Sequence, residues 1–258
     1  MAPVATPDAL IAACKSGDAR SAARILRRDG SLANCADSDG RSPLFWASFY
    51  GHESVVRLLL KNGATIERAD SEGRTPLWIA CQEGQEATVR LLLDKDASIN
   101  HADKEGCTPL FMACQNGHES TARLLLGKGA TVNHANNNGA TPLFMACQDG
   151  HESTARLLLG KGATVDLARN DGVTPLVMAC QYGHESTARL LLDNGALINH
   201  VDNSAGRSPL FWASFQGHES VVRLLLKNGA TIDSADSKGW TPLWVACQEG
   251  QEVISRLL

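Results

Sequence analysis

Apolar and polar positions along the chain recur with a period of 33 residues. Each copy has the form Gly-x-Ser/Thr-Pro-Leu, from 40–44 in the first copy to 239–243 in the last. Successive copies start 33 residues apart, except for one interval of 34. The Pro-Leu dipeptides begin at Pro43, Pro76, Pro109, Pro142, Pro175, Pro209 and Pro242. A period of this length is typical of a chain built from stacked supersecondary units, each of which contacts only its neighbours.

Each copy predicts two helices. Ser42 is a residue type that caps helix N-termini, and Pro43 follows at the first helical position, where its missing N–H has no cost. The apolar segment after it ends at Gly51, the residue type expected after a helix C-terminus. Apolar residues at helical spacing in 53–61 predict the second helix of the pair.

The two ends of the chain depart from the regular copies. Residues 9–18 form a degenerate copy that lacks the Thr-Pro start, so we predict a capping unit over 1–36 and the repeat array over 37–258. The array then contains six full repeats and a truncated seventh, because 251–258 aligns with 85–92 and stops inside the second helix. We expect the chain to be part of a longer array or of a larger protein.

The repeated unit resembles the ankyrin repeat family, and the resemblance covers residues 37–258. In one copy it is carried by Asp70, Gly73, Thr75, Pro76, Leu77, Ala80, Gly84, Leu92 and Leu93, after Gly63 and Ala64 at the end of the preceding copy. The resemblance implies an all-α solenoid of stacked helix–turn–helix units with β-hairpin fingers, elongated and curved. It also implies that the fingers and first helices lie on the concave side.

One departure from the family is systematic. The family usually has histidine after Pro-Leu, where this chain has Phe45, Trp78, Phe111, Phe144, Val177, Phe211 and Trp244. We expect these side chains to be buried between repeats, so that apolar burial replaces a polar link. The alternative is an exposed ladder of rings on which a ligand stacks.

Composition excludes several classes of function. The chain has 258 residues and a net charge of −4, from 24 basic and 28 acidic side chains, so nucleic acid is not an expected partner. No apolar run approaches the roughly 18 residues of a membrane span, so we expect no membrane insertion. The N-terminus lacks a basic region before its apolar stretch and carries Asp8, which argues against a secretory signal. We expect a cytoplasmic or nuclear protein.

The cysteines and histidines do not form a reactive or metal-binding pattern. Five of the eight cysteines share one repeat position: Cys81, Cys114, Cys147, Cys180 and Cys247. Packed helices lie about 10 Å apart, whereas a disulfide needs Cα atoms within about 7 Å. We therefore interpret these cysteines as free core residues, which favours a reducing compartment.

Several repeats also have a Cys-x-x-x-His spacing, but each supplies two ligands where structural zinc needs four, so we predict no metal. No phosphate-binding, dinucleotide-binding or nucleophile motif is present. We predict no enzyme activity, no cofactor and no small-molecule substrate.

Comparison of the copies with one another indicates a recognition surface. Residues 42–66 and 208–232 differ only at Tyr50 and Gln216. The residue before the inter-helix glycine and the residue before Ser/Thr-Pro vary across the array, and the family resemblance places both in the concave groove. What we call the predicted groove consists of Arg41, Phe49, Tyr50, Arg74, Glu83, Asn116, Asp149, Tyr182, Arg207, Phe215, Gln216, Trp240 and Glu249. The alternative is that exposed positions vary without selection.

These observations favour a protein–protein interaction scaffold that recognises a protein partner through the concave groove, with aromatic and arginine residues as anchors. The alternative is a structural spacer or regulatory array within a channel, kinase or effector whose activity lies in other domains. The family resemblance further implies that Asn100, Asn133 and Asn199 occupy a position at which asparagine can be hydroxylated.

Overall fold

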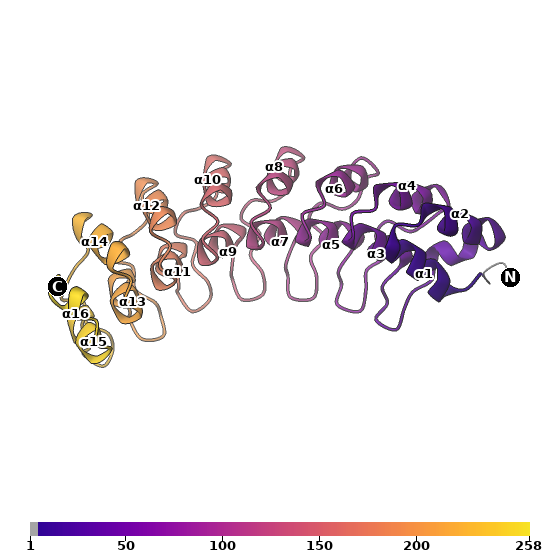
Figure 1. The fold of residues 1–258 in the computed structure, drawn as a ribbon. Coiled ribbons are helices and arrows are strands. Elements are labelled where there is room, and N and C mark those ends of the chain that lie inside the picture. The colour runs from indigo at the N-terminus through magenta and orange to yellow at the C-terminus, as the bar shows by residue number, and fades with distance from the viewer. Residues whose placement is uncertain (1–4) are drawn as a thin grey trace. The chain divides into compact units, whose positions relative to one another are not determined.

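The computed structural model describes residues 5–258, which fall into two compact units, 5–131 and 132–258. Figure 1 labels the helices of both. Residues 1–4 of the predicted capping unit lie outside the described part. The first unit contains α1 (Pro7–Ser16), α2 (Ala19–Arg28), a short 3₁₀ helix (Gly30–Asn34), α3 (Pro43–Phe49), α4 (Glu53–Lys61), α5 (Pro76–Gln82), α6 (Glu86–Leu93), α7 (Pro109–Gln115) and α8 (Glu119–Gly127). The second contains α9 (Pro142–Gln148), α10 (Glu152–Gly160), α11 (Pro175–Gln181), α12 (Glu185–Asp193), α13 (Pro209–Gln216), α14 (Glu219–Lys227), α15 (Pro242–Gln248) and α16 (Glu252–Ser255).

The predicted helix starts and ends are confirmed by their local chemistry. Ser42 accepts a hydrogen bond from the backbone N–H of Phe45 at 3.1 Å, and Pro43 is the first residue of α3. The helix ends before Gly51, which has a left-handed φ of 71°. That backbone conformation favours glycine and lets the chain reverse into α4.

The N-terminal helix pair corrects one expectation. The sequence comparison predicts a copy without a Thr-Pro start, yet α1 begins at Pro7 and its cap Thr6 accepts a hydrogen bond from Ala9 N–H at 3.2 Å. This start lies two residues further upstream than in the other copies. Accordingly α1 has 10 residues, where α3 has 7.

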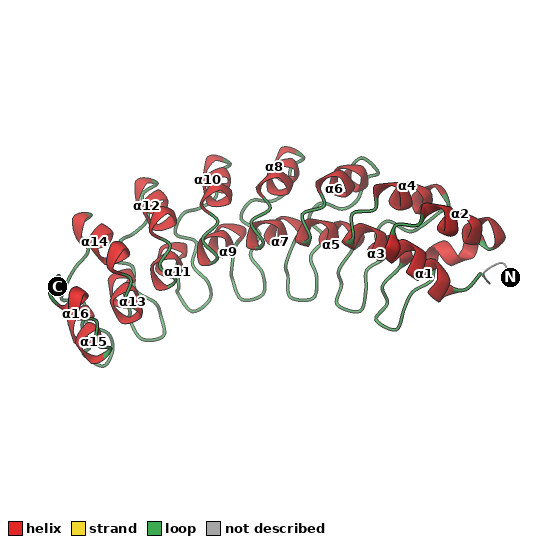
Figure 2. Cartoon of the chain, in the orientation of Figure 1, coloured by secondary structure: helices red, strands yellow, loops and turns green. Residues whose placement is uncertain are grey.

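Helix pairs stack in the same way within each unit. In the first unit α1, α3, α5 and α7 pack one on the next, and α2, α4, α6 and α8 form a second row. The second unit repeats this with α9, α11, α13 and α15 in one row and α10, α12, α14 and α16 in the other. In both units the long loops extend from the side of the first helices (Figure 2). The chain is an all-helical repeat solenoid.

The residue after Pro-Leu forms the core between repeats. It is buried in six copies, namely Phe45, Trp78, Phe111, Phe144, Val177 and Phe211. Trp78 also donates its indole N–H to the carbonyl oxygen of Cys107 at 2.9 Å. The expectation is wrong for Trp244, whose side chain is 41% exposed, because within residues 5–258 no further first helix covers the outer side of α15. Cys247 is exposed for the same reason, whereas the four other cysteines at its position are buried.

The long loops are built from turns. No β-strand is present in residues 5–258, so the β-hairpin fingers are not confirmed. Asp70 shows what holds a loop together, because one of its carboxylate oxygens accepts the backbone N–H groups of Glu72 and Arg74, each at 2.9 Å. Adjacent loops are linked by a single backbone hydrogen bond, such as Ser71 N–H to Asp39 C=O at 2.9 Å. These contacts fix the loops that carry four residues of the predicted groove, Arg41, Arg74, Arg207 and Trp240.

Candidate partner-binding surface

All residues of the predicted groove lie at the C-terminal ends of first helices or at the ends of loops. Six are exposed: Tyr50, Asn116, Asp149, Tyr182, Gln216 and Glu249. Seven are half-buried: Arg41, Phe49, Arg74, Glu83, Arg207, Phe215 and Trp240. The exposed set belongs to the position before the inter-helix glycine, which is therefore the position most open to a partner.

The arginines of the predicted groove are already paired within the protein. Arg74 Nη2 lies 2.6 Å from the Asp70 carboxylate, and Arg41 Nε lies 3.9 Å from the same group. In the second unit Arg207 pairs with Asp236 at 3.5 Å. Both aspartate side chains are fully buried, so the Arg41–Asp70 and Arg207–Asp236 pairs tie adjacent loops together, whereas the Arg74–Asp70 pair braces a single loop. These pairs leave little free positive charge for a partner.

Asp236 illustrates the electrostatics of these turns. Burial alone would raise the pKa of its carboxyl group, but backbone N–H groups of Trp240 and Lys238 and the guanidinium of Arg207 hold that pKa below its usual value. The carboxylate therefore stays charged and keeps the loop before α15 in place.

Four side chains in the first unit form what we call the aromatic platform: Lys15, Trp46, Phe49 and Tyr50. Trp46 and Tyr50 stack with ring centroids 6.3 Å apart, and Phe49 meets Tyr50 edge-on at 4.8 Å. The ammonium group of Lys15 lies 3.8 Å from the centroid of Trp46, a cation–π contact. Sequence reasoning missed Lys15 and Trp46. Helical spacing could have indicated Trp46, which lies four residues before Tyr50 on the same helix face.

The second unit has a cavity of about 80 Å³ between α13 and α15. It brings together three residues of the predicted groove, Arg207, Phe215 and Trp240, with Trp244 among its other walls. Trp240 and Trp244 stack 4.3 Å apart. Its walls are mostly apolar, Gln248 adds a polar side chain, and the charge of Arg207 is neutralised by Asp236.

The histidines after the inter-helix glycines link neighbouring repeats. His118 Nε2 lies 2.9 Å from the carbonyl oxygen of Gln82, and His184 Nε2 lies 2.9 Å from that of Gln148. Sequence reasoning assigned these histidines no such role, although their recurrence at the repeat period was a signal. Residues 5–258 contain no group of three or more His, Cys, Asp or Glu side chains placed to hold a metal ion.

Burial also determines the chemistry of the core thiols. Desolvation raises the pKa of Cys14 to about 12 and raises the pKa of Cys114, Cys147 and Cys180 further. These thiols stay protonated at neutral pH, and a protonated thiol is neither a nucleophile nor a metal ligand. Their role in the described structure is packing.

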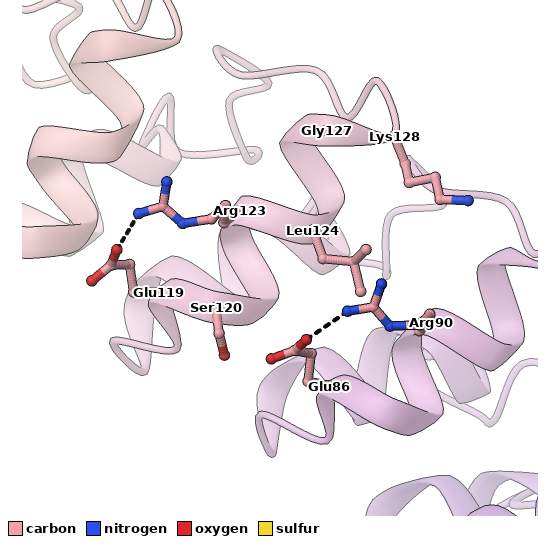
Figure 3. A pocket seen from close by; sticks show the side chains of 8 residues that line it. All are labelled: Glu86, Arg90, Glu119, Ser120, Arg123, Leu124, Gly127 and Lys128. Atoms are coloured by element: carbon pink, nitrogen blue, oxygen red, sulfur yellow. Dashed lines mark hydrogen bonds and ion pairs between the residues drawn. The ribbon is translucent and has the colours of Figure 1, made fainter.

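A larger hollow, of about 670 Å³, lies on the opposite row of helices, between α6 and α8 (Figure 3). Its charged walls are ion pairs within single helices, Glu86 with Arg90 and Glu119 with Arg123. None of the predicted groove residues lines it. Exposed pairs of this kind contribute little to stability and leave few unpaired charges for recognition.

Comparison with known proteins gives one finding. A family model described as ankyrin repeats, in three copies, matches residues 5–70, 66–136, 128–202 and 196–258, so its matches together span the described chain. No curated protein sequence matches the chain. None of the helices in residues 5–258 combines the length and the apolar character that a membrane span requires.

Proposed function

The chain belongs to the ankyrin repeat family, and we propose that it is a scaffold that recognises another protein through the predicted groove. Ankyrin repeats are generally protein-interaction modules, and the family is typically non-catalytic. The observation that carries the proposal is the contrast between a constant buried scaffold and exposed, variable side chains such as Tyr50 and Tyr182, which are 45% and 51% exposed. Rigid elements that present changeable side chains suit recognition.

The proposal also assigns a role to each part of the chain. Residues 1–36 act as the capping unit and 37–258 as the recognition array, with no catalytic residue, cofactor, metal or nucleic-acid partner. All eight cysteines are free, which fits a reducing compartment such as the cytoplasm.

Affinity capture followed by calorimetry tests this function. The full chain is used as bait, and a captured protein is purified and titrated against the wild type, Tyr182→Ala and Trp240→Ala. Each substitution should weaken binding by ~1–3 kcal/mol, because aromatic residues on a binding surface dominate interface energies. Arg156→Ala, on the exposed face of α10, is the matched control and should leave the affinity unchanged. Unchanged affinity in both aromatic variants contradicts groove recognition. Failure to find any saturable partner favours the structural spacer.

A further inference from the structure

Comparison of two nearly identical segments of the chain identifies Tyr50 as a residue that the fold does not require. Residues 42–66 and 208–232 differ only at Tyr50 and Gln216. Both segments form the same helix pair, and the histidine of each bonds the carbonyl oxygen of the preceding first helix, His52 to Lys15 and His218 to Gln181. Because the second copy folds in this way with glutamine, the tyrosine serves some purpose other than folding.

Tyr50 is held in place but open to solvent. Its ring stacks between Trp46 and His52, with centroids 6.3 and 5.9 Å away, and its side chain is 45% exposed. Its hydroxyl makes no hydrogen bond with any residue in 5–258. A ring that is fixed by its neighbours loses little conformational entropy on binding, which is typical of an interface anchor.

The helices that precede the two copies differ in a cation, which lies in α1 before the first copy. Lys15 bonds His52 through its carbonyl oxygen, so its counterpart in the second unit is Gln181, which bonds His218 in the same way. The Lys15 ammonium lies over Trp46, and within the described residues no carboxylate lies within 4.0 Å of it. The nearby Arg41, by contrast, pairs with Asp39 at 3.0 Å.

The acidic groups around the aromatic platform are already engaged. Asp37 accepts the indole N–H of Trp46 at 3.0 Å and two backbone N–H groups, and Asp39 pairs with Arg41. In the next repeat, Glu83 accepts a hydrogen bond from Gln82 at 2.7 Å. The Lys15 ammonium is therefore the charged group of the platform that lacks an oppositely charged partner.

We propose that the aromatic platform binds a peptide segment of a partner protein in which a carboxylate lies next to a large apolar side chain. The proposal rests on the proposed recognition function and names the chemistry of the ligand. The carboxylate pairs with Lys15, the apolar side chain packs against Phe49 and Tyr50, and the Tyr50 hydroxyl bonds the peptide backbone. Charge complementarity selects the acidic segment, and the fixed rings supply apolar contact area.

A labelled peptide tests this inference on the full chain. The probe is a fluorescein-labelled nonapeptide of alternating aspartate and leucine or phenylalanine, and its comparison peptide carries lysine at every aspartate position. In anisotropy titrations, Tyr50→Gln and Lys15→Gln should each weaken binding of the acidic probe about 5- to 30-fold. Glutamine already occupies both counterpart positions in the second unit, so these variants should fold.

The second unit supplies a gain-of-function test. In the double variant Gln181→Lys, Gln216→Tyr the second copy acquires both missing groups, and the number of acidic peptides bound per chain should rise from one to two. Binding to the wild type should weaken as salt concentration rises, because a charge pair is involved.

Equal binding of the acidic and lysine peptides, equal binding by wild type and Tyr50→Gln, or no binding by the wild type overturns the inference. If the wild type captures a protein partner in a manner that depends on Tyr182 or Trp240 but does not bind the acidic peptide, this inference fails while the proposed function stands. If neither is bound, both fail.

Discussion

Several buried threonine and serine hydroxyls make no hydrogen bond within residues 5–258, and their effect on stability can be measured one residue at a time. Thr121 in α8 is fully buried, and its hydroxyl has no hydrogen-bond partner among residues 5–258. Val55 and Val221 occupy the same position in other repeats and are equally buried. An unsatisfied buried hydroxyl costs ~1–3 kcal/mol. We therefore expect Thr121→Val to raise the free energy of unfolding by about 1 kcal/mol.

Urea denaturation followed by circular dichroism measures this change as a higher midpoint with an unchanged slope. Ser120→Ala, at the neighbouring exposed position of α8, is the control and should shift stability by less than about 0.5 kcal/mol. A lower midpoint for Thr121→Val would show that the hydroxyl is satisfied in solution.

At the same scale, sequence reasoning finds residues whose role is local. The cap Ser42 and the turn-forming Gly51 follow from the chemistry of two or three neighbouring residues. Contacts such as Lys15 over Trp46 could not be predicted, because they join residues 31 apart that only the stacking of α1 on α3 brings together. The pairing of Arg41 with Asp70 was hidden for the same reason, so its guanidinium was read as a free anchor.

The junction between successive helix pairs depends on a glycine that packs against a histidine. Gly84 has a φ of +66°, and a Cβ placed on it would lie 2.6 Å from Nδ1 of His118, whose Nε2 lies within hydrogen-bond distance of the Gln82 carbonyl oxygen. Gly129 has a similar left-handed φ of +93°, but within the described residues no atom other than those of its chain neighbours lies within 4 Å of such a Cβ. A substitution at Gly129 therefore tests the cost of the left-handed backbone alone, whereas a substitution at Gly84 also tests the contact with His118.

We expect Gly129→Ala to cost about 1 kcal/mol, because it introduces only the left-handed conformation of a residue with a Cβ. Gly84→Ala should cost about 2–3 kcal/mol, because it also displaces His118 and weakens the hydrogen bond between repeats. Urea denaturation of the two variants side by side measures the difference. Equal losses would mean that the histidine moves aside freely and does not tie the helix pairs together.

The sequence predicts the helices better than it predicts the loops. Helix bounds follow from caps and periodicity, but the expected β-hairpin came from the family resemblance alone. In the structure one carboxylate, as at Asp70, satisfies the backbone N–H groups of the turn, and a single backbone bond from Ser71 joins the neighbouring loop. With so few backbone hydrogen bonds between loops, residues 5–258 form no strand ladder.

At the scale of the whole molecule, position in the stack determines how a repeat behaves. The helices α5 and α15 differ only at Ile79 and Val245, so their intrinsic helix propensities are nearly equal. First helices pack on both sides of α5, and Leu77 is 1% exposed. Within residues 5–258, α13 is the one first helix that packs on α15, and Leu243 is 39% exposed. The repeat pattern predicts the same core residues in every copy, so it does not by itself predict that Leu243 is more exposed than Leu77.

Hydrogen–deuterium exchange should therefore distinguish these two helices. In a solenoid each repeat is stabilised by its interfaces with its neighbours, so a helix with one interface opens locally more often than a helix with two. We expect the amides of α15 to exchange at least ~10-fold faster than those of α5, which corresponds to a difference of about 1.4 kcal/mol in opening free energy. The helices α3 and α13 serve as the control, because they share the sequence PLFWASF and each packs between two first helices. The exchange rates of their amides should therefore be similar. Equal protection of α5 and α15 would mean that each helix pair is stable by itself and that stacking contributes little, which would contradict the solenoid energetics inferred from the buried aromatic residues.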